Sequence, residues 1–243
     1  MPNRIFMFSD IDDTLIQTGR KTDFEKKTVV GGYTKEGKEN SFFYEGTKVL
    51  IDTLIDSNIT FVPTTARDIA SYNRTIFPQK EKIKYAILNF GGTILIDNKI
   101  DSLWKEKMDR EYSQIESIDT LLTALVYEFQ SAGLHLVIKT IADFYISVYN
   151  KYSIDDKGIL EEVRDILTDF IEKNSDFYLY ENDNSFGILP NFLNKKFAVE
   201  YLIEREKPIL TIGAGDNLSD LDFMNLTSFQ LVPNNSFIHK SYR

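Results

Sequence analysis

Short runs of apolar residues recur near both ends of the chain, and each run stops at a polar or glycine-bearing turn. They cover residues 5–8, 59–62, 85–88 and 209–212. Consecutive apolar positions are what a strand buried on both faces requires. Apolar residues at helical spacing lie between these runs, most clearly over residues 195–206. The alternation of strand and helix predicts an α/β fold whose parallel sheet is covered by helices on both faces.

Polar residues follow directly where these predicted strands end. They are Asp10, Thr65, Asn89 and Asp216. In an open parallel sheet, ligands bind at the carboxyl ends of the strands. We therefore expect these four side chains to lie at one edge of the sheet, and we take Arg67 and Asn89 as candidates for contacts to substrate or to the inserted domain.

The middle of the chain has a different pattern of apolar and polar residues. It predicts a helix followed by two strands of alternating apolar and polar residues, and this pattern occurs twice, with helices at 115–132 and 159–171. We predict an inserted α+β domain of (αββ)2 type over 99–190, because polar turns bound it as they often bound domains. The core domain is then 1–98 with 191–243. The polar, glycine-bearing segment at about 17–44 is expected to form a flap or hairpin.

Composition narrows the chemistry. The chain has 243 residues, a net charge of −9, no cysteine and two histidines. An acidic chain does not suit nucleic acid, and the missing thiols exclude disulfides and zinc–thiolate sites. Because no apolar run is long enough for a signal peptide or a membrane span, we expect a cytoplasmic protein without a membrane role.

Two acidic clusters stand at the predicted strand ends. Asp10 and Asp12 belong to a D-x-D-x-T element, and an extended turn would point both to the same side. Asp216 and Asp220 are four residues apart, and so share one face if a helix begins there. Four carboxylates in one crevice require a hard cation, and oxygen ligands suit Mg²⁺. The alternative is that both clusters are helix caps.

A lysine at the start of the 195–206 helix would offset this charge and bind an anion. Lys195 and Lys196 both fit, and the alternative for either is an ordinary solvated side chain.

Four motifs, in order along the whole chain, resemble those of the haloacid dehalogenase superfamily. The resemblance is to phosphohydrolases with a type IIB cap, such as the Cof-like and sucrose-phosphatase-like phosphatases. The motifs are 8–15 (FSDIDDTL), 61–67 (FVPTTAR), 194–199 (NKKFAV) and 213–224. The resemblance implies a Rossmann-like core with an inserted cap. It selects Thr65 over Thr64 and Lys195 over Lys196.

The sequence departs from the family pattern at four positions. Asp13, Ala66 and Lys196 replace glycines, and Ser219 replaces an asparagine that is common in relatives. The last change puts a contact to the metal's water shell in question.

The resemblance also implies roles for the site residues. Asp10 would be the nucleophile that forms an aspartyl-phosphate, and Asp12 the general acid and base. Mg²⁺ would be held by Asp10, Asp216 and the backbone carbonyl of Asp12. Asp220, outside the metal's own ligands, would orient Lys195 or a metal-bound water. Thr65 and Lys195 would bind the phosphate oxygens.

One face of the predicted cap sheet carries tyrosines. Tyr145 and Tyr178 lie on it, with Lys139 in phase on a neighbouring strand. The opposite face is apolar and is expected to pack on the cap helices. In the family the open face closes over the active site, so these three residues are candidates for contacts to a sugar phosphate. The alternative is that this face is an ordinary, partly solvent-exposed sheet face or an oligomer contact.

The sequence as a whole indicates a Mg²⁺-dependent phosphatase acting on a small phosphate ester, such as a sugar or sugar-acid phosphate. A phosphomutase of the same superfamily is one alternative, and a non-catalytic phospho-ligand binding protein is another. The oligomeric state is left open.

Overall fold

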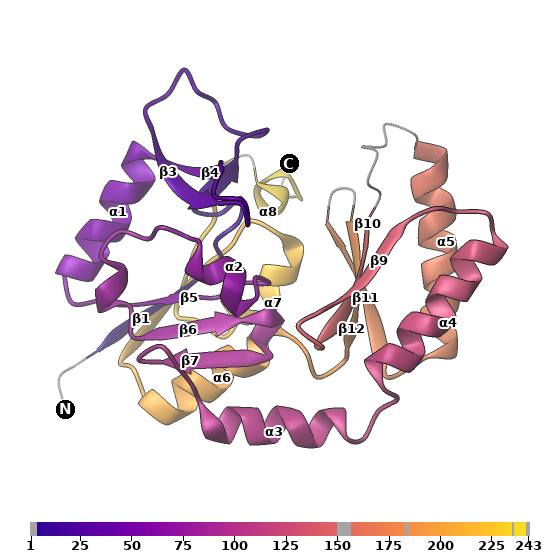
Figure 1. Cartoon of the computed structure of the whole chain (residues 1–243). Coiled ribbons are helices and arrows are strands. Elements are labelled where there is room, and N and C mark those ends of the chain that lie inside the picture. The colour runs from indigo at the N-terminus through magenta and orange to yellow at the C-terminus, as the bar shows by residue number, and fades with distance from the viewer. Residues whose placement is uncertain (1–3, 150–156, 183–184, 235, 242–243) are drawn as a thin grey trace. The chain divides into compact units, whose positions relative to one another are not determined.

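The computed structural model describes residues 4–149, 157–182, 185–234 and 236–241. The chain divides into two compact units, Met1–Lys105 with Asn194–Arg243 and Glu106–Leu193 (Figure 1). The division falls within helix α3, Ser102–Tyr112. Among the described residues, no helix combines the length and the apolar composition that a bilayer crossing needs.

A parallel sheet forms the centre of the first unit. Its strands are β1 (Ile5–Ser9), β5 (Thr60–Pro63), β13 (Leu210–Ala214) and β14 (Phe229–Leu231), in the order β14-β13-β1-β5. A parallel bridge from Thr64 to Ile87 places β6, Tyr85–Leu88, beside β5. The predicted parallel core is confirmed, because the buried apolar runs pair in this sheet.

Helices cover this sheet. Those of the first unit are α1 (Glu45–Asp56), α2 (Ile69–Asn73), α6 (Lys195–Glu206), α7 (Leu221–Met224) and α8 (Phe237–Ser241). Ile51 and Ile55 of α1 pack with Met7 and Phe61 in one continuous core. Burying each such side chain stabilises the fold by roughly 1.5–3 kcal/mol.

The excursion after the first strand forms a small antiparallel sheet of its own. Its strands are β2 (Ile16–Thr18), β3 (Thr28–Tyr33) and β4 (Glu39–Tyr44), in the order β2-β4-β3. We call it the flap sheet. β4 leads directly into α1, so the flap sheet is joined to the core at both of its ends.

Some elements of the first unit were not predicted from the sequence. They are α2, α3, α8, β7 (Thr93–Ile96), β8 (Lys99–Ile100) and the short 3₁₀ turns at Lys80–Lys82 and Asn89–Gly91. The turn at Leu218–Asp220 and α7 together form the short helix that was predicted after Asp216. β7 pairs antiparallel with β6 and turns the chain toward α3.

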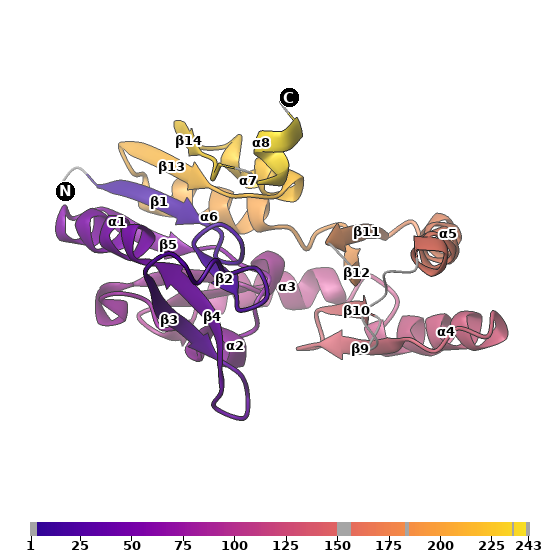
Figure 2. The same cartoon turned by 90° about the horizontal axis from the view of Figure 1, so that it is seen from above.

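The second unit has the predicted double αββ order. Its elements are α4 (Ile118–Ser131), β9 (Val137–Ile141), β10 (Tyr145–Tyr149), α5 (Lys157–Lys173), β11 (Phe177–Asn182) and β12 (Ser185–Pro190). The strands form an antiparallel sheet in the order β11-β12-β10-β9. Both helices lie on one face of it (Figure 2), where Leu125 and Leu167 pack against Ile146 and Ile188. The expected apolar face of this sheet is therefore confirmed.

Candidate active site

Adjacent strands bring the first and last acidic motifs together. Ser9 of β1 pairs with Ala214 of β13, and the Asp10 amide donates to the Ala214 carbonyl at 2.9 Å. The next turn of the chain carries Asp216. A Cβ atom at Gly215 would lie 2.4 Å from Cβ of Asp220, so only glycine lets Asp220 approach this closely.

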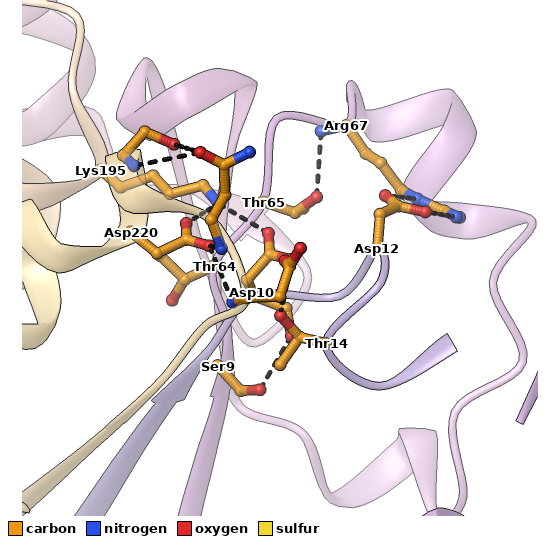
Figure 3. A network of polar contacts seen from close by, with 12 residues as sticks. Ser9, Asp10, Asp12, Thr14, Thr64, Thr65, Arg67, Lys195 and Asp220 are labelled. Atoms are coloured by element: carbon orange, nitrogen blue, oxygen red, sulfur yellow. Dashed lines mark hydrogen bonds and ion pairs between the residues drawn. The ribbon is translucent and has the colours of Figure 1, made fainter. Parts of the chain in front are cut away.

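Lys195 joins two carboxylates of this cluster. Its Nζ lies 2.6 Å from Oδ1 of Asp10 and 2.8 Å from Oδ1 of Asp220 (Figure 3). Helix α6 starts at Lys195 because the Asn194 side chain caps it, accepting a hydrogen bond from the Lys196 amide. The Lys195 side chain is only 8% exposed. Burial lowers its pKa, but the two carboxylates more than offset this effect, so the pKa is raised and the ammonium stays charged.

Asp220 also binds the main chain beside it. Its Oδ2 accepts from the amides of Asp216 and Asn217, at 3.3 and 3.2 Å. Asp220 thus fixes the loop that carries Asp216 while its other oxygen holds Lys195.

Thr14 links Asp10 to the third carboxylate, Asp216. Its hydroxyl lies 3.2 Å from Oδ2 of Asp10 and 3.0 Å from Oδ1 of Asp216. Our sequence-based set of site residues did not include Thr14, although it is the last residue of the D-x-D-x-T element. Its position in that motif was the available signal.

Asp12 lies apart from this cluster, contrary to the expectation that it and Asp10 point to the same side. Its carboxylate receives two hydrogen bonds from Arg67, from Nε at 2.8 Å and Nη2 at 2.6 Å (Figure 3). The alternation of an extended chain fails here because residues 11–16 form a turn, in which Leu15 donates to Ile11 and Asp13 has a φ of 61°. Arg67, a candidate for contact with substrate or cap, pairs with Asp12 in this structure, and its contact with a substrate stays a prediction.

The second motif places its two threonines differently. Thr64 donates its hydroxyl back to the Val62 carbonyl, whereas Oγ1 of Thr65 accepts from the Arg67 amide at 3.2 Å. Asn89 is buried, and its side-chain amide donates to Thr93 at 3.1 Å.

The acidic cluster carries more negative charge than its single lysine offsets. Asp10, Asp216 and Asp220 each offer an oxygen within 4.8 Å of the others. Three carboxylates and one ammonium leave two negative charges. Burial raises the pKa of Asp10 well above its usual range, although Lys195 opposes this, and burial with Asp220 raises the pKa of Asp216 to about 7. This donor set, all oxygen and short of positive charge, fits a hard divalent cation.

The three candidate substrate residues of the second unit differ in exposure. Tyr145 is 9% exposed, and Tyr178 donates its hydroxyl to the Leu193 carbonyl. Lys139 is exposed, with its Nζ 5.2 Å from the centre of the Tyr149 ring. Of the three, Lys139 is the most accessible to a ligand.

No protein-family model and no curated protein matches the sequence. Solved structures do match. Sucrose-phosphatase from Synechocystis sp. PCC6803, in complex with sucrose and phosphate, has a TM-score of 0.63 at 16% identity, over 100% of this chain and 87% of that one. The C-terminal domain of trehalose-6-phosphate phosphatase from C. albicans has a TM-score of 0.57 at 15% identity, over 92% of this chain and 73% of that one.

A haloacid dehalogenase-like hydrolase from Bacteroides thetaiotaomicron also has a TM-score of 0.57, at 8% identity, over 98% of this chain and 97% of that one. These matches extend over both units. The chain therefore has the fold of haloacid dehalogenase-like hydrolases, an α/β core with an inserted α+β domain.

Proposed function

We propose that this protein is a phosphomonoesterase that transfers the phosphoryl group of a small phosphate ester to Asp10 and then to water. The observation that carries the proposal is the setting of the Asp10 carboxylate. It is buried at a strand end, with Lys195 on one oxygen and Thr14 on the other. A carboxylate with both oxygens oriented in this way is a positioned nucleophile.

A Mg²⁺ ion would be held by Asp10, Asp216 and the backbone carbonyl of Asp12, and would supply positive charge that lets the anionic ester approach an anionic nucleophile. Lys195 supplies further positive charge from the protein itself. Its ammonium has three N–H donors, and Asp10 and Asp220 use two of them. The third is directed to an oxygen of the phosphoryl group, as is the hydroxyl of Thr65.

The chemistry then runs on two carboxyl groups. An Asp10 oxygen forms a bond to phosphorus while the bond from phosphorus to the ester oxygen breaks, and Asp12 gives its proton to the departing alcohol. Water attacks the phosphorus of the aspartyl-phosphate, and Asp12 takes the proton of this water. Inorganic phosphate leaves and the Asp10 carboxylate is restored.

The open face of the inserted sheet favours a sugar or sugar-acid phosphate as substrate. Cross-strand pairing puts Lys139, Ser147, Gly187 and Tyr180 in one row. Gly187 adds no side chain of its own, and the Leu189 side chain lies over it, with Cδ1 2.7 Å from where a Cβ atom of Gly187 would be, so the row combines polar, aromatic and aliphatic groups. Such surfaces suit polyhydroxylated rings, which present both hydroxyls and apolar C–H faces.

The test is release of inorganic phosphate from a panel of sugar, sugar-acid and nucleotide phosphates, with Mg²⁺ or with EDTA. We expect Mg²⁺-dependent release from at least one sugar or sugar-acid phosphate, and its loss in Asp10→Asn. Asp52→Asn is the matched control, because Asp52 is paired with Lys48 on α1 outside this cluster. Isomer formation without phosphate release would indicate a mutase, and near-wild-type hydrolysis by Asp10→Asn would refute the assignment of Asp10.

A further inference from the structure

The Arg67 guanidinium has a third hydrogen-bond partner besides the two oxygens of Asp12. Its Nη1 donates to Oγ1 of Thr75 at 2.6 Å. The guanidinium is planar and rigid, so a contact at Nη1 constrains the angle at which Nε and Nη2 meet Asp12. The orientation of the Asp12 carboxylate therefore depends on where the Thr75 hydroxyl is held.

The Thr75 hydroxyl is fixed by its surroundings. Thr75 is 1% exposed, and its hydroxyl donates to the Ser71 carbonyl at 3.3 Å. With its proton directed to Ser71, the oxygen presents a lone pair to Arg67. Ser71 in turn lies in α2. The Asp68 side chain caps this helix, because its Oδ1 accepts a hydrogen bond from the Ser71 amide at 2.6 Å.

The main chain around Thr75 is joined to the flap sheet. Thr75 forms an antiparallel bridge with Gly32 of β3. The Ile76 amide donates to the Gly31 carbonyl at 2.9 Å, and the Tyr33 amide donates to the Arg74 carbonyl at 3.2 Å. A Cβ atom at Gly32 would lie 3.3 Å from the Arg74 carbonyl oxygen and 2.7 Å from Oγ of Ser41, so a glycine suits this approach.

We propose that Thr75 is a positioning residue for Asp12, acting through Arg67, and that it ties the orientation of the general acid to the flap sheet. The inference rests on the proposed function, because it assigns Asp12 the proton transfer to the leaving group. Thr75 itself touches neither substrate nor the reacting atoms. Its hydroxyl sets the guanidinium, and the guanidinium sets the carboxylate.

The test compares two substrates whose leaving groups differ in how strongly they need a proton from a general acid. Phenyl phosphate releases a poor leaving group that requires a proton, whereas p-nitrophenyl phosphate releases one that departs as an anion. We expect Thr75→Val, which removes the hydroxyl but keeps the shape, to lower kcat for phenyl phosphate on the order of tenfold more than for p-nitrophenyl phosphate. Thr75→Ser, which restores the hydroxyl, should recover most of the loss.

Thr211→Val is the matched control, because Thr211 is also buried and its hydroxyl bonds to Ser228. It should change the rates for both substrates by the same small factor. Should Thr75→Val fail to fold, Thr75→Ala allows the same comparison. Equal losses for the two substrates in the Thr75 variants, or no loss, would overturn this inference while leaving the proposed function intact. A wild-type protein that releases phosphate from neither these two esters nor the panel of sugar, sugar-acid and nucleotide phosphates would overturn the proposed function itself.

Discussion

Arg67 holds Asp12 through a two-point contact, with Nε and Nη2 each on a different carboxylate oxygen. Burial lowers the pKa of the guanidinium, but its hydrogen bonds and the charge of Asp12 outweigh this and raise the pKa overall. The pair is asymmetric in exposure, since the Arg67 side chain is 16% exposed and that of Asp12 47% exposed. The guanidinium is thus the more buried member of the pair, and the carboxylate is the one that reaches solvent.

Replacing Arg67 by lysine should reduce turnover although it keeps the charge. An ammonium is a point donor and cannot form the two-point contact, so the Asp12 carboxylate should lose its fixed orientation. We expect kcat for phenyl phosphate to fall roughly tenfold to a hundredfold, with KM changed less than kcat.

Arg164→Lys is the control for this prediction. Arg164 forms the same two-point contact with Glu181 in the other unit. Its Nε lies 3.1 Å from Oε2 of Glu181, and its Nη2 lies 2.5 Å from Oε1. Its replacement should leave kcat unchanged. Equal kcat values for the wild type and Arg67→Lys would mean that the two-point contact has no part in turnover.

Replacing Lys195 by methionine should cost stability as well as activity. The variant leaves the buried carboxylates of Asp10 and Asp220 without their cation. Breaking a buried pair by removing one partner typically costs about 3–5 kcal/mol in the free energy of unfolding. We expect a loss of that size in urea unfolding at pH 8 without added metal, and no measurable turnover.

Lys196→Met tests the same substitution one residue further along α6. Lys196 is half-buried, with its Nζ 4.9 Å from the centre of the Phe197 ring. Substitutions outside a buried polar network or the core usually change the free energy of unfolding by about 0.5 kcal/mol or less. We expect a loss near that size for Lys196→Met. Similar losses in the two variants would contradict the buried charge network.

Stabilisation by Mg²⁺ should depend on pH. Burial and Asp220 raise the pKa of Asp216 from 3.8 to about 7 in the folded protein. The folded state therefore binds this proton more tightly than the unfolded state does. Without metal, the contribution of this proton to the free energy of unfolding is fully present below pH 4. It is lost as the pH rises through 7, a change of about 4 kcal/mol.

Because the proton and the metal compete for the same carboxylate, Mg²⁺ should raise Tm more at pH 8 than at pH 6. Thermal unfolding with Mg²⁺ and with EDTA at the two pH values measures this difference. Asp216→Asn should remove most of it. An equal Tm shift at both pH values would show that Asp216 does not bind the ion.

The sequence could place Asp10 and Asp216 together because strand ends are local features. The helix start left Lys195 and Lys196 both open, and only the family resemblance selected Lys195. A continuous apolar run that stops at a polar residue marks the edge of a parallel sheet, and β1 and β13 are neighbours in it. The double αββ pattern could be read in the same way, since its helices and strands have distinct periodicities.

Side-chain direction in turns could not be predicted in this way. The Asp12 carboxylate faces Arg67 within a turn in which Asp13 has a positive φ, and the alternation of apolar and polar positions does not specify this turn. The contact of Thr14 with Asp10 and Asp216 likewise depends on this turn. Tyr145 lies on a strand face that alternation predicts correctly, but its burial depends on neighbours from other strands.

In the proposed reaction the phosphoryl group passes through Asp10, and this transfer can be measured on the covalent intermediate. Wild-type protein is mixed with p-nitrophenyl phosphate and Mg²⁺, quenched in acid within the first turnover, and reduced with borohydride, which converts an aspartyl-phosphate to homoserine. Peptide mass spectrometry should then find homoserine at position 10. Turnover of the ester with homoserine at another aspartate, or at none, would contradict the account.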